Sequence, residues 1–394
     1  MMLPVRHMQA LPDFFIDITD PRRGQGRRHS LPTVLSISVA ATLCGAKGYK
    51  GISDWANSLG QKALVNFRCR KKNGKRVVPS LSIIRNVMVG VDPDDLDAAL
   101  QRWTAIYSKK DDSLAIDGKT MRGAVAENGR QVHIMSAIGH HSQDCYAQKK
   151  VGLIPVEGTD DFKQTNEIKI ASVLLDSIDN IEGVTVTADA LLTQRELARY
   201  LKGRNAYYHF TVKDNQKNLR QDIAAQFQDR GAPDFTEDKC LTHGRIESRK
   251  IWVTSKLNDY LEFPDVGQAF AIERNVTNKK TGKSSCELVF GITSKTPEQA
   301  SPRQVLTTNR GHWVIENGCH YIIDSIYDED RSQIRTGHGP VNITRLRRFA
   351  VGILKSSGVK NISQKMRQIS YKSRMIVDYL RMTKKYWSEV AEVN

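Results

Sequence analysis

The sequence predicts an α/β protein in which helices flank a mixed β-sheet, with a helical segment before the sheet and a β-rich insertion within it. Three observations support this fold class. Residues 1–110 carry helical patterns, residues 111–234 alternate between strand and helix patterns, and residues 235–300 contain three strand-like runs separated by polar turns. Helical patterns return in residues 301–394, which end in a basic tail. We therefore expect these four segments to be the structural units of the chain.

The composition favours a globular protein that meets polyanions. The chain of 394 residues is long enough for two or three domains, and its hydrophobic content of 40% is sufficient to build cores. The net charge of +16 is spread along the chain, which makes nucleic acid the expected class of partner. Neither a basic amphipathic helix nor an apolar run of 18 residues stands out, so we expect no membrane partner.

The cysteines and the N-terminus indicate the compartment. Six cysteines are scattered singly, a pattern that argues against a zinc ribbon or finger. The first fifteen residues lack the apolar run of a signal peptide. We expect a cytoplasmic protein with reduced thiols, associated with the nucleoid through its charge.

Residues 1–110 are expected to form a small helical domain with a role in DNA binding. The run from Pro32 to Gly45 is apolar on nearly every side, and Ser30 can cap it, so a buried helix is predicted there. Further helices are predicted at residues 52–59, 80–90 and 92–110. The basic loop 68–76 precedes one of them, and a short helix after a basic loop could enter a DNA groove. Helices that only pack together fit the same pattern equally well.

The change to strand patterns begins at residue 113. Alternating and β-branched runs predict strands, and the longer periodic runs between them predict helices. The predicted strands are residues 113–117, 131–141, 147–156, 184–190 and 206–213, and the predicted helices are 165–179, 192–203, 312–327 and 342–355. The last of these helices has Leu346, Phe349, Ala350, Ile353 and Leu354 on one face.

Three acidic side chains stand at positions that suit a metal site. Asp117 ends one predicted strand and Asp189 ends another, so both would project toward one edge if the strands are neighbours. Glu316 lies in a predicted helix, where His312, Glu316, His320 and Asp324 share a face. Converging carboxylates suit Mg²⁺ or Mn²⁺, and two such ions can activate one oxygen and stabilise another in phosphoryl displacement. From the residues alone, Asp117 could equally be an ordinary strand-end cap.

Other chemistries lack their signatures. Gly118-Lys119-Thr120 looks like the end of a phosphate-binding P-loop, but that motif requires glycine at position 113, where this chain has Ser113. A zinc site of histidines and acids around Glu316 has no cysteine to support it. No local motif for a nucleophilic serine or cysteine is present.

A set of ordered motifs resembles a known family. The strings are LAIDGKTMRGA, TNEI, VTADALLTQRELA, KDNQKNL, HGRIESR, HWVIEN and LRRFAVGILK. In this order and over nearly the whole chain, they resemble the DDE transposases of bacterial insertion sequences, in the branch that includes the Rhs-linked H-repeat-associated proteins. The resemblance implies a ribonuclease-H-like catalytic domain in two parts, residues 111–234 and 301–394. It also implies that the β-rich insertion separates them and that a helical domain precedes them.

The resemblance also implies roles. Asp117, Asp189 and Glu316 would be the catalytic and metal-binding triad, holding two Mg²⁺ or Mn²⁺ ions. The residues implied to bind DNA are Lys119, Arg122, Lys213, Asn215, Gln216, Arg245, Arg249, His312, Trp313 and Asn317. The reaction would be phosphodiester hydrolysis followed by transesterification, in which a freed 3′-hydroxyl attacks a second phosphodiester. The partners would be double-stranded terminal inverted repeats and target DNA, bound by a homodimer.

Departures from the family pattern, including Gly318 beside Glu316 and Asp214 in the KDNQ motif, keep other functions open. Relatives often have arginine at the position of His312 and lysine at the position of Ile323. One alternative is a relic or regulator that binds DNA without transposing it, although the intact acids speak against this. A second alternative is a metal-dependent nuclease that cuts DNA without joining strands.

Overall fold

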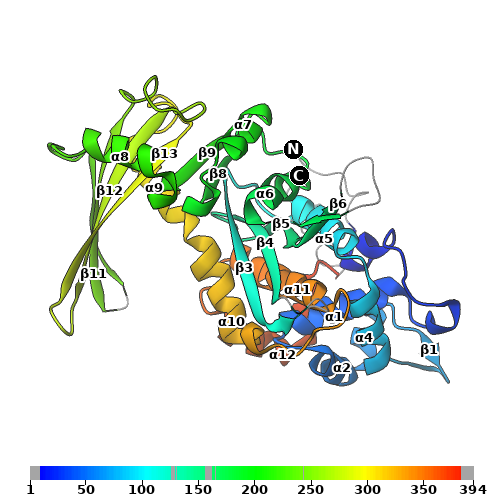
Figure 1. Ribbon diagram of the computed structural model, residues 1–394. Coiled ribbons are helices and arrows are strands. Elements are labelled where there is room, and N and C mark those ends of the chain that lie inside the picture. Colours follow the sequence, from blue (N-terminus) through cyan, green and yellow to red (C-terminus); the bar gives the residue numbers. More distant parts are fainter. Residues whose placement is uncertain are drawn as a thin grey trace, which may run out of the picture.

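The computed structural model describes residues 9–382 except 126–128, 130, 156–161, 165 and 243. At its centre is a nine-stranded sheet with the order β10-β11-β12-β13-β9-β8-β3-β4-β5, and helices pack on both faces of its central part (Figure 1). The predicted α/β class is therefore confirmed. Within the described residues, no helix is both long and apolar enough to cross a membrane. Residues 383–394 of the predicted basic tail lie outside the described part of the chain.

Five strands give the sheet the topology that the resemblance implies. They are β3 (Ser113–Val125), β4 (Gln131–Gly139), β5 (Cys145–Val151), β8 (Thr185–Ala188) and β9 (Tyr207–Val212). The first three pair antiparallel, whereas β8 runs parallel to β3 on one side and to β9 on the other. A three-stranded meander whose first strand is joined by two parallel strands is the arrangement of a ribonuclease-H-like sheet. A short separate pair, β6 (Leu153–Pro155) with β7 (Phe162–Gln164), follows β5.

The insertion extends this sheet rather than forming a separate one. Its strands are β10 (Phe235–Thr242), β11 (Arg245–Thr254), β12 (Gln268–Asn278) and β13 (Ser284–Thr293). They pair antiparallel, and β13 joins the edge strand β9 through Phe290 to Thr293. The far ends of β11 and β12 project away from the helices (Figure 1). Three strands were predicted here and four are present, because the charged run that forms β10 has little apolar alternation.

The N-terminal helices agree with the predicted helical segment. Ser30 caps α1 as expected, with its Oγ accepting a hydrogen bond from the backbone N–H of Thr33 at 3.4 Å. Almost the whole of α1 is buried, which explains its apolar sequence. The elements are η2 (Leu11–Phe15), η3 (Gly24–Gly26), α1 (Leu31–Leu43), α2 (Tyr49–Asn57), α3 (Gln61–Asn66), α4 (Leu81–Gly90), α5 (Pro93–Tyr107) and a two-stranded pair of β1 (Lys71–Lys72) and β2 (Lys75–Arg76).

The N-terminal helices share one hydrophobic core with the C-terminal helices. The ring of Trp103 in α5, for example, packs edge-on against Phe349 of α11, with centroids 5.0 Å apart. The predicted apolar face of α11 is buried in this core. The C-terminal elements are α9 (Pro302–His312), a π-helix labelled η6 (Ile315–His320), α10 (Tyr321–Tyr327), η7 (Glu329–Arg331), α11 (Gly339–Ser356), α12 (Ile362–Ser370) and α13 (Ser373–Tyr379).

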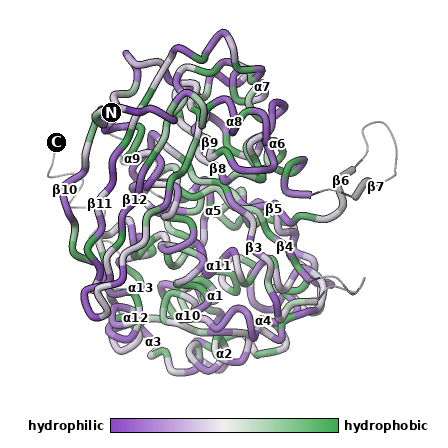
Figure 2. Tube along the Cα trace, turned by 60° about the vertical axis from the view of Figure 1, so that its left-hand side comes forward, coloured by the Kyte–Doolittle hydropathy of each residue, from purple (hydrophilic) through white to green (hydrophobic). Residues whose placement is uncertain are grey.

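A second core lies on the other face of the sheet, under α6 (Glu167–Asp176), α7 (Arg195–Gly203) and α8 (Lys217–Gln226). Figure 2 shows these helices grouped near the top and α1, α10 and α11 grouped below. Successive residues of a strand face opposite sides of a sheet. In β3, Ala115 belongs to the first core, while Leu114 and Ile116 belong to the second. Asp117 therefore faces the α9–α11 side and Gly118 faces the α6 side.

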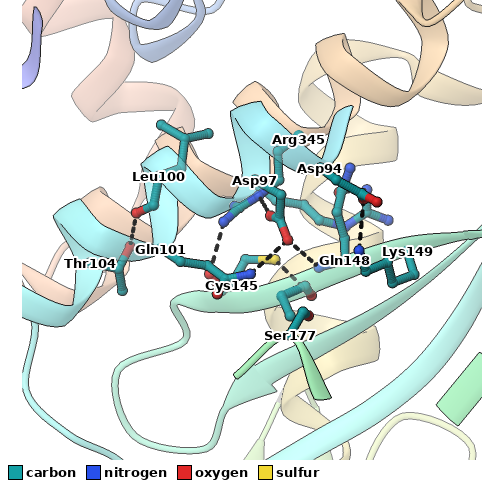
Figure 3. A network of polar contacts seen from close by, with 12 residues as sticks. Asp94, Asp97, Leu100, Gln101, Thr104, Cys145, Gln148, Lys149, Ser177 and Arg345 are labelled. Atoms are coloured by element: carbon teal, nitrogen blue, oxygen red, sulfur yellow. Dashed lines mark hydrogen bonds and ion pairs between the residues drawn. The ribbon is translucent and has the colours of Figure 1, made fainter. Parts of the chain in front are cut away.

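A buried ion pair fixes α5 to α11. Asp97 and Arg345 form this pair with side chains 3% and 1% exposed (Figure 3). Asp97 Oδ2 also accepts hydrogen bonds from Gln101 Nε2 at 2.8 Å and from the backbone N–H of Gln148 at 3.2 Å. Arg345 Nη2 donates to the carbonyl of Cys145 at 3.3 Å. This network joins the N-terminal helices, strand β5 and α11 through polar contacts inside the first core.

Candidate active site

Asp117 and Asp189 occupy equivalent positions on neighbouring strands. The parallel pairing of β3 with β8 runs as far as Ile116 opposite Ala188, so each aspartate comes one residue after the last pair. Past this point β3 continues to Val125, because residues 117–121 pair with β4, so the prediction that a strand ends at Asp117 is wrong. The chain after β8 turns into η4 (Ala190–Leu192). Asp189 caps η4, because its Oδ1 accepts a hydrogen bond from the backbone N–H of Leu192 at 3.3 Å. The expectation that the two strands are neighbours is confirmed.

The helix that carries Glu316 approaches the same place from the α9–α11 side. His312 Nδ1 lies 3.1 Å from Thr187 Oγ1 of β8, and Asp324 Oδ2 lies 2.6 Å from Lys119 Nζ of β3. Glu316 and His320 lie between these two contacts, so the four residues predicted to share a helical face do turn toward the sheet. The helix is not regular, since Ile315–His320 form a π-helix. Such wide turns are frequent at functional sites.

Asp117, Glu316 and His320 form a group that could hold a metal ion. Among the described residues, one ligand atom from each of these three lies within 4.8 Å of the others. His320 Nδ1 is 3.5 Å from Asp117 Oδ2 and 3.5 Å from Glu316 Oε2, and the imidazole is buried. The carboxylate of Asp189 is outside this group. Two carboxylates and an imidazole are a suitable donor set for a divalent cation.

The electrostatics of the site reflect crowded carboxylates. Burial raises the pKa of Asp117 to about 7, and the charges of Asp189, Glu167 and Glu316 act in the same direction. Burial also raises the pKa of Asp189. The hydrogen bond from His320 lowers the pKa of Glu316. Like charges that are held together disfavour ionisation unless a cation offsets them, so the residues present fit a bound divalent ion.

Gly118 and Gly123 of the LAIDGKTMRGA string are required by close packing against neighbouring residues. A side chain at position 118 would overlap the side chains of Glu167 and His133. A side chain at position 123 would overlap the backbone of Asp330 and Ser332, which follow α10. Gly318 is constrained in the same way, because a Cβ there would come within 2.5 Å of Gln143 Oε1.

The basic residues of β3 contact acids of α10 and of η7, which follows it. Lys119 is mostly buried in its ion pair with Asp324. Arg122 is exposed and its Nε lies 3.6 Å from Asp330 Oδ2. The position of Ile323, where relatives often carry lysine, is buried in the first core. Lys119 of β3 brings a positive charge to this region in place of a lysine at position 323. The pKa of Glu316 is lowered mainly by the hydrogen bond from His320, and the charge of Lys119 adds to this effect.

The KDNQ motif supports the loop after Asp189. Asn215 Nδ2 donates to the carbonyl of Ala190 at 2.5 Å, and Gln216 Nε2 donates to the carbonyl of Thr193 at 2.8 Å. Both residues belong to the turn η5 (Asp214–Gln216) that follows β9. Their amides therefore fix the backbone that positions the second aspartate. Lys213 is exposed, and its charge opposes the effect of burial on the pKa of Asp189.

The remaining predicted DNA contacts differ in accessibility. Arg249 is largely buried between Glu237 at 3.2 Å and Glu247 at 2.6 Å, whereas Arg245 is exposed at the start of β11. Burial lowers the pKa of His312 to about 4, which keeps its imidazole neutral. Trp313, which is 58% exposed, and Asn317 lie on the solvent side of the same helical segment. The structure leaves Arg245, Trp313 and Asn317 free to contact DNA and engages Arg249 and His312 within the protein.

Glu167 is an acidic residue of this site that was not among the predicted site residues. It is the first residue of α6, and its charge acts on both Asp117 and Asp189. Glu167 belongs to the TNEI string, but a glutamate in the first turn of a helix is common because it favours the helix dipole. His320 was noted beside Glu316 without a role. Glu167 and His320 are identified as residues of the site only by their contacts with parts of the chain that are distant in the sequence.

Comparison with known proteins agrees with this geometry. The family model described as "Transposase DDE domain" matches residues 108–347, and the model "DDE_Tnp_1-associated" matches residues 12–104. The putative transposase YncI of Escherichia coli O157:H7 is 25% identical over 91% of this chain and 92% of its own length. The H repeat-associated putative transposase YhhI of E. coli K12 is 24% identical over 92% of this chain and 94% of its own.

Two further matches are more distant or less informative. An uncharacterized protein in the dhlA 3′ region of Xanthobacter autotrophicus is 29% identical over 72% of this chain and 94% of its own. A piggyBac transposase synaptic complex with hairpin DNA matches with a TM-score of 0.40 and 11% identity, covering 96% of this chain and 79% of that one. That score is too low to add to the argument. The family model spans well over half of the chain, and the chain therefore belongs to the transposases with a DDE domain.

Proposed function

We propose that this protein is a DNA transposase that cleaves phosphodiesters at the ends of an insertion sequence and joins them to target DNA. The observation that supports this most strongly is the convergence of Asp117, Glu316 and His320 beside the end of the parallel strand pair. Asp117 and Asp189 each come one residue after the last pair of β3 with β8, and Glu316 comes from a helix packed across those strands. Hydrolysis and strand joining are both in-line displacements at phosphorus, so one such site serves for both steps.

In this proposal Asp117, Asp189 and Glu316 hold two divalent cations, Mg²⁺ or Mn²⁺. When bound, the ions supply activation of the attacking oxygen and stabilisation of the leaving oxygen. His320 orients the two carboxylates on either side of its Nδ1 and favours the ionised form of Glu316. Asn215 and Gln216 orient Asp189 through the backbone of η4.

The DNA would lie across the exposed basic residues around this site. Arg122, Lys213 and Arg245 are exposed to solvent and suit contacts to phosphates. Such contacts position a duplex without reading its sequence. Trp313 is the exposed aromatic residue three positions before Glu316 and suits stacking on an unpaired base near the cut. We further propose that the protein acts in the cytoplasm, at the nucleoid, as a homodimer that pairs two DNA ends.

A cleavage assay tests this function. The purified protein is incubated with labelled DNA that carries the terminal inverted repeats of its own element, in Mg²⁺ or Mn²⁺, with EDTA as the control. We expect nicks at the repeat ends and products joined to target DNA, both abolished by EDTA. Nicks without joined products would indicate a nuclease. Binding without any cleavage in either metal would indicate a relic or regulator and would contradict the proposal.

A further inference from the structure

A fourth carboxylate reaches the active site from the opposite face of the sheet. Glu316 approaches Asp117 from the α9–α11 side, whereas α6 packs on the other side through Ile170 and Leu174. Glu167 begins α6 and lies against β3 where Gly118 follows Asp117. Because Gly118 has no side chain, the carboxylate of Glu167 occupies the space that a side chain would fill. The sequence Asp117-Gly118 thus presents one acid on one face and admits another from the opposite face.

The position of Glu167 is fixed by residues of the sheet. Its Oε1 lies 2.7 Å from His133 Nε2, and His133 Nδ1 lies 2.7 Å from Thr120 Oγ1. Thr120 and His133 are direct partners in the pairing of β3 with β4. His133 thus contacts Thr120 through one ring nitrogen and lies against the Glu167 carboxylate through the other, although His133 Nε2 makes no hydrogen bond to any described residue. These contacts hold the carboxylate of Glu167 beside Gly118, the residue after Asp117.

The surroundings of Glu167 differ from those of an ordinary helix-capping acid. Its side chain is 19% exposed, so it is largely desolvated while one side still meets solvent. It lies against Gly118, the residue after Asp117, and its charge raises the pKa of both Asp117 and Asp189. The N-terminus of α6 would be stabilised by the charge of Glu167 alone. It does not account for the presence of the Asp117 and Asp189 carboxylates nearby. A further cation would offset this repulsion.

We propose that Glu167 is a metal-binding residue of the active site, on the side of Asp117 opposite to Glu316 and His320. In this arrangement Asp117 lies between two sets of ligands. Glu316 and His320 are on one side and Glu167 is on the other, while Asp189 lies at the end of the neighbouring strand. Hard oxygen donors of this kind suit Mg²⁺ or Mn²⁺. His133 acts as a positioning residue for Glu167. The inference rests on the proposed function, since it concerns the ions of that same site.

Titration of the full-length protein with Mn²⁺ tests this role without DNA or activity. Free Mn²⁺ is followed by electron paramagnetic resonance in the wild type and in Glu167→Gln, which keeps the side-chain volume and removes the charge. We expect the wild type to bind two ions and Glu167→Gln to bind one of them about 10- to 100-fold more weakly. Thermal unfolding in EDTA checks that the variant is folded.

Two further variants separate the possible outcomes. Glu196→Gln removes an exposed glutamate from the first turn of α7, as Glu167→Gln does from the first turn of α6, and should bind Mn²⁺ as the wild type does. Asp117→Asn should weaken both ions. If Glu167→Gln binds like Glu196→Gln while Asp117→Asn is impaired, the role of Glu167 is wrong and the proposed metal site stands. If all variants bind like the wild type, or the wild type binds no Mn²⁺, both are wrong.

Discussion

Replacing Asp117 by asparagine is expected to lower the rate of DNA cleavage at the terminal repeats by about 10³-fold or more. The substitution keeps the size of the side chain but removes a charge that every arrangement of ions in the site requires. Loss of such a ligand removes several kcal/mol of transition-state stabilisation, and each 1.4 kcal/mol corresponds to about tenfold in rate. Single-turnover cleavage of labelled DNA, with protein in excess, measures the effect on the chemical step.

Asp112→Asn is the matched control for this variant. Asp112 directly precedes β3, its carboxylate is exposed, and its Oδ1 lies 3.6 Å from Nε2 of the exposed His141. Its removal changes the net charge by the same amount and should leave the cleavage rate within about twofold, the effect expected of a screened surface charge. Equal rates for Asp117→Asn and Asp112→Asn would contradict the assignment of Asp117.

Replacing Asp97 by alanine is expected to lower the free energy of unfolding by about 3–5 kcal/mol. Arg345 would then remain in the first core with its charge uncompensated, since both side chains of the pair are almost fully buried. The backbone N–H of Gln148 and the side chain of Gln101 would also lose an acceptor (Figure 3). Urea denaturation followed by circular dichroism measures the change.

The neighbouring pair on the same helix provides the comparison. Asp94 lies one turn before Asp97 and forms an ion pair with Lys149 at 2.8 Å, but its side chain is 66% exposed (Figure 3). Asp94→Ala should therefore cost less than about 1 kcal/mol, because solvent screens exposed pairs. A loss of similar size in both variants would mean that burial does not determine the importance of these pairs.

The parts of the fold that depend on local patterns were predictable from the sequence. Alternation and β-branched residues located the start of β3 and the strand β8 that ends just before Asp189, but not the continuation of β3 past Asp117 to Val125. An i, i+3, i+4 pattern located the buried face of α11. The four-residue spacing from His312 to Asp324 correctly placed these side chains on the face that meets the sheet. These features are encoded by neighbours in the sequence.

The features that depend on distant contacts were not predictable. Strand β10 is a charged edge strand whose ion pairs, such as Glu237 with Arg249, replace apolar alternation. The π-helix around Glu316 has no local sequence signal, and the glycine at position 318 within it lies against Gln143, a residue far away in the sequence. Asp97 and Arg345 belong to opposite ends of the chain, so their pairing leaves no local signal.

The most direct test of the account is the location of Mn²⁺ in a crystal of the protein. Crystals soaked in Mn²⁺, or grown with terminal-repeat DNA and Mn²⁺, are measured at a wavelength where the ion scatters anomalously. We expect peaks bonded to the carboxylates of Asp117 and Glu316, with Asp189 turned toward them. Peaks that avoid all three acids while the same crystals contain ordered Mn²⁺ elsewhere would contradict the active site described above.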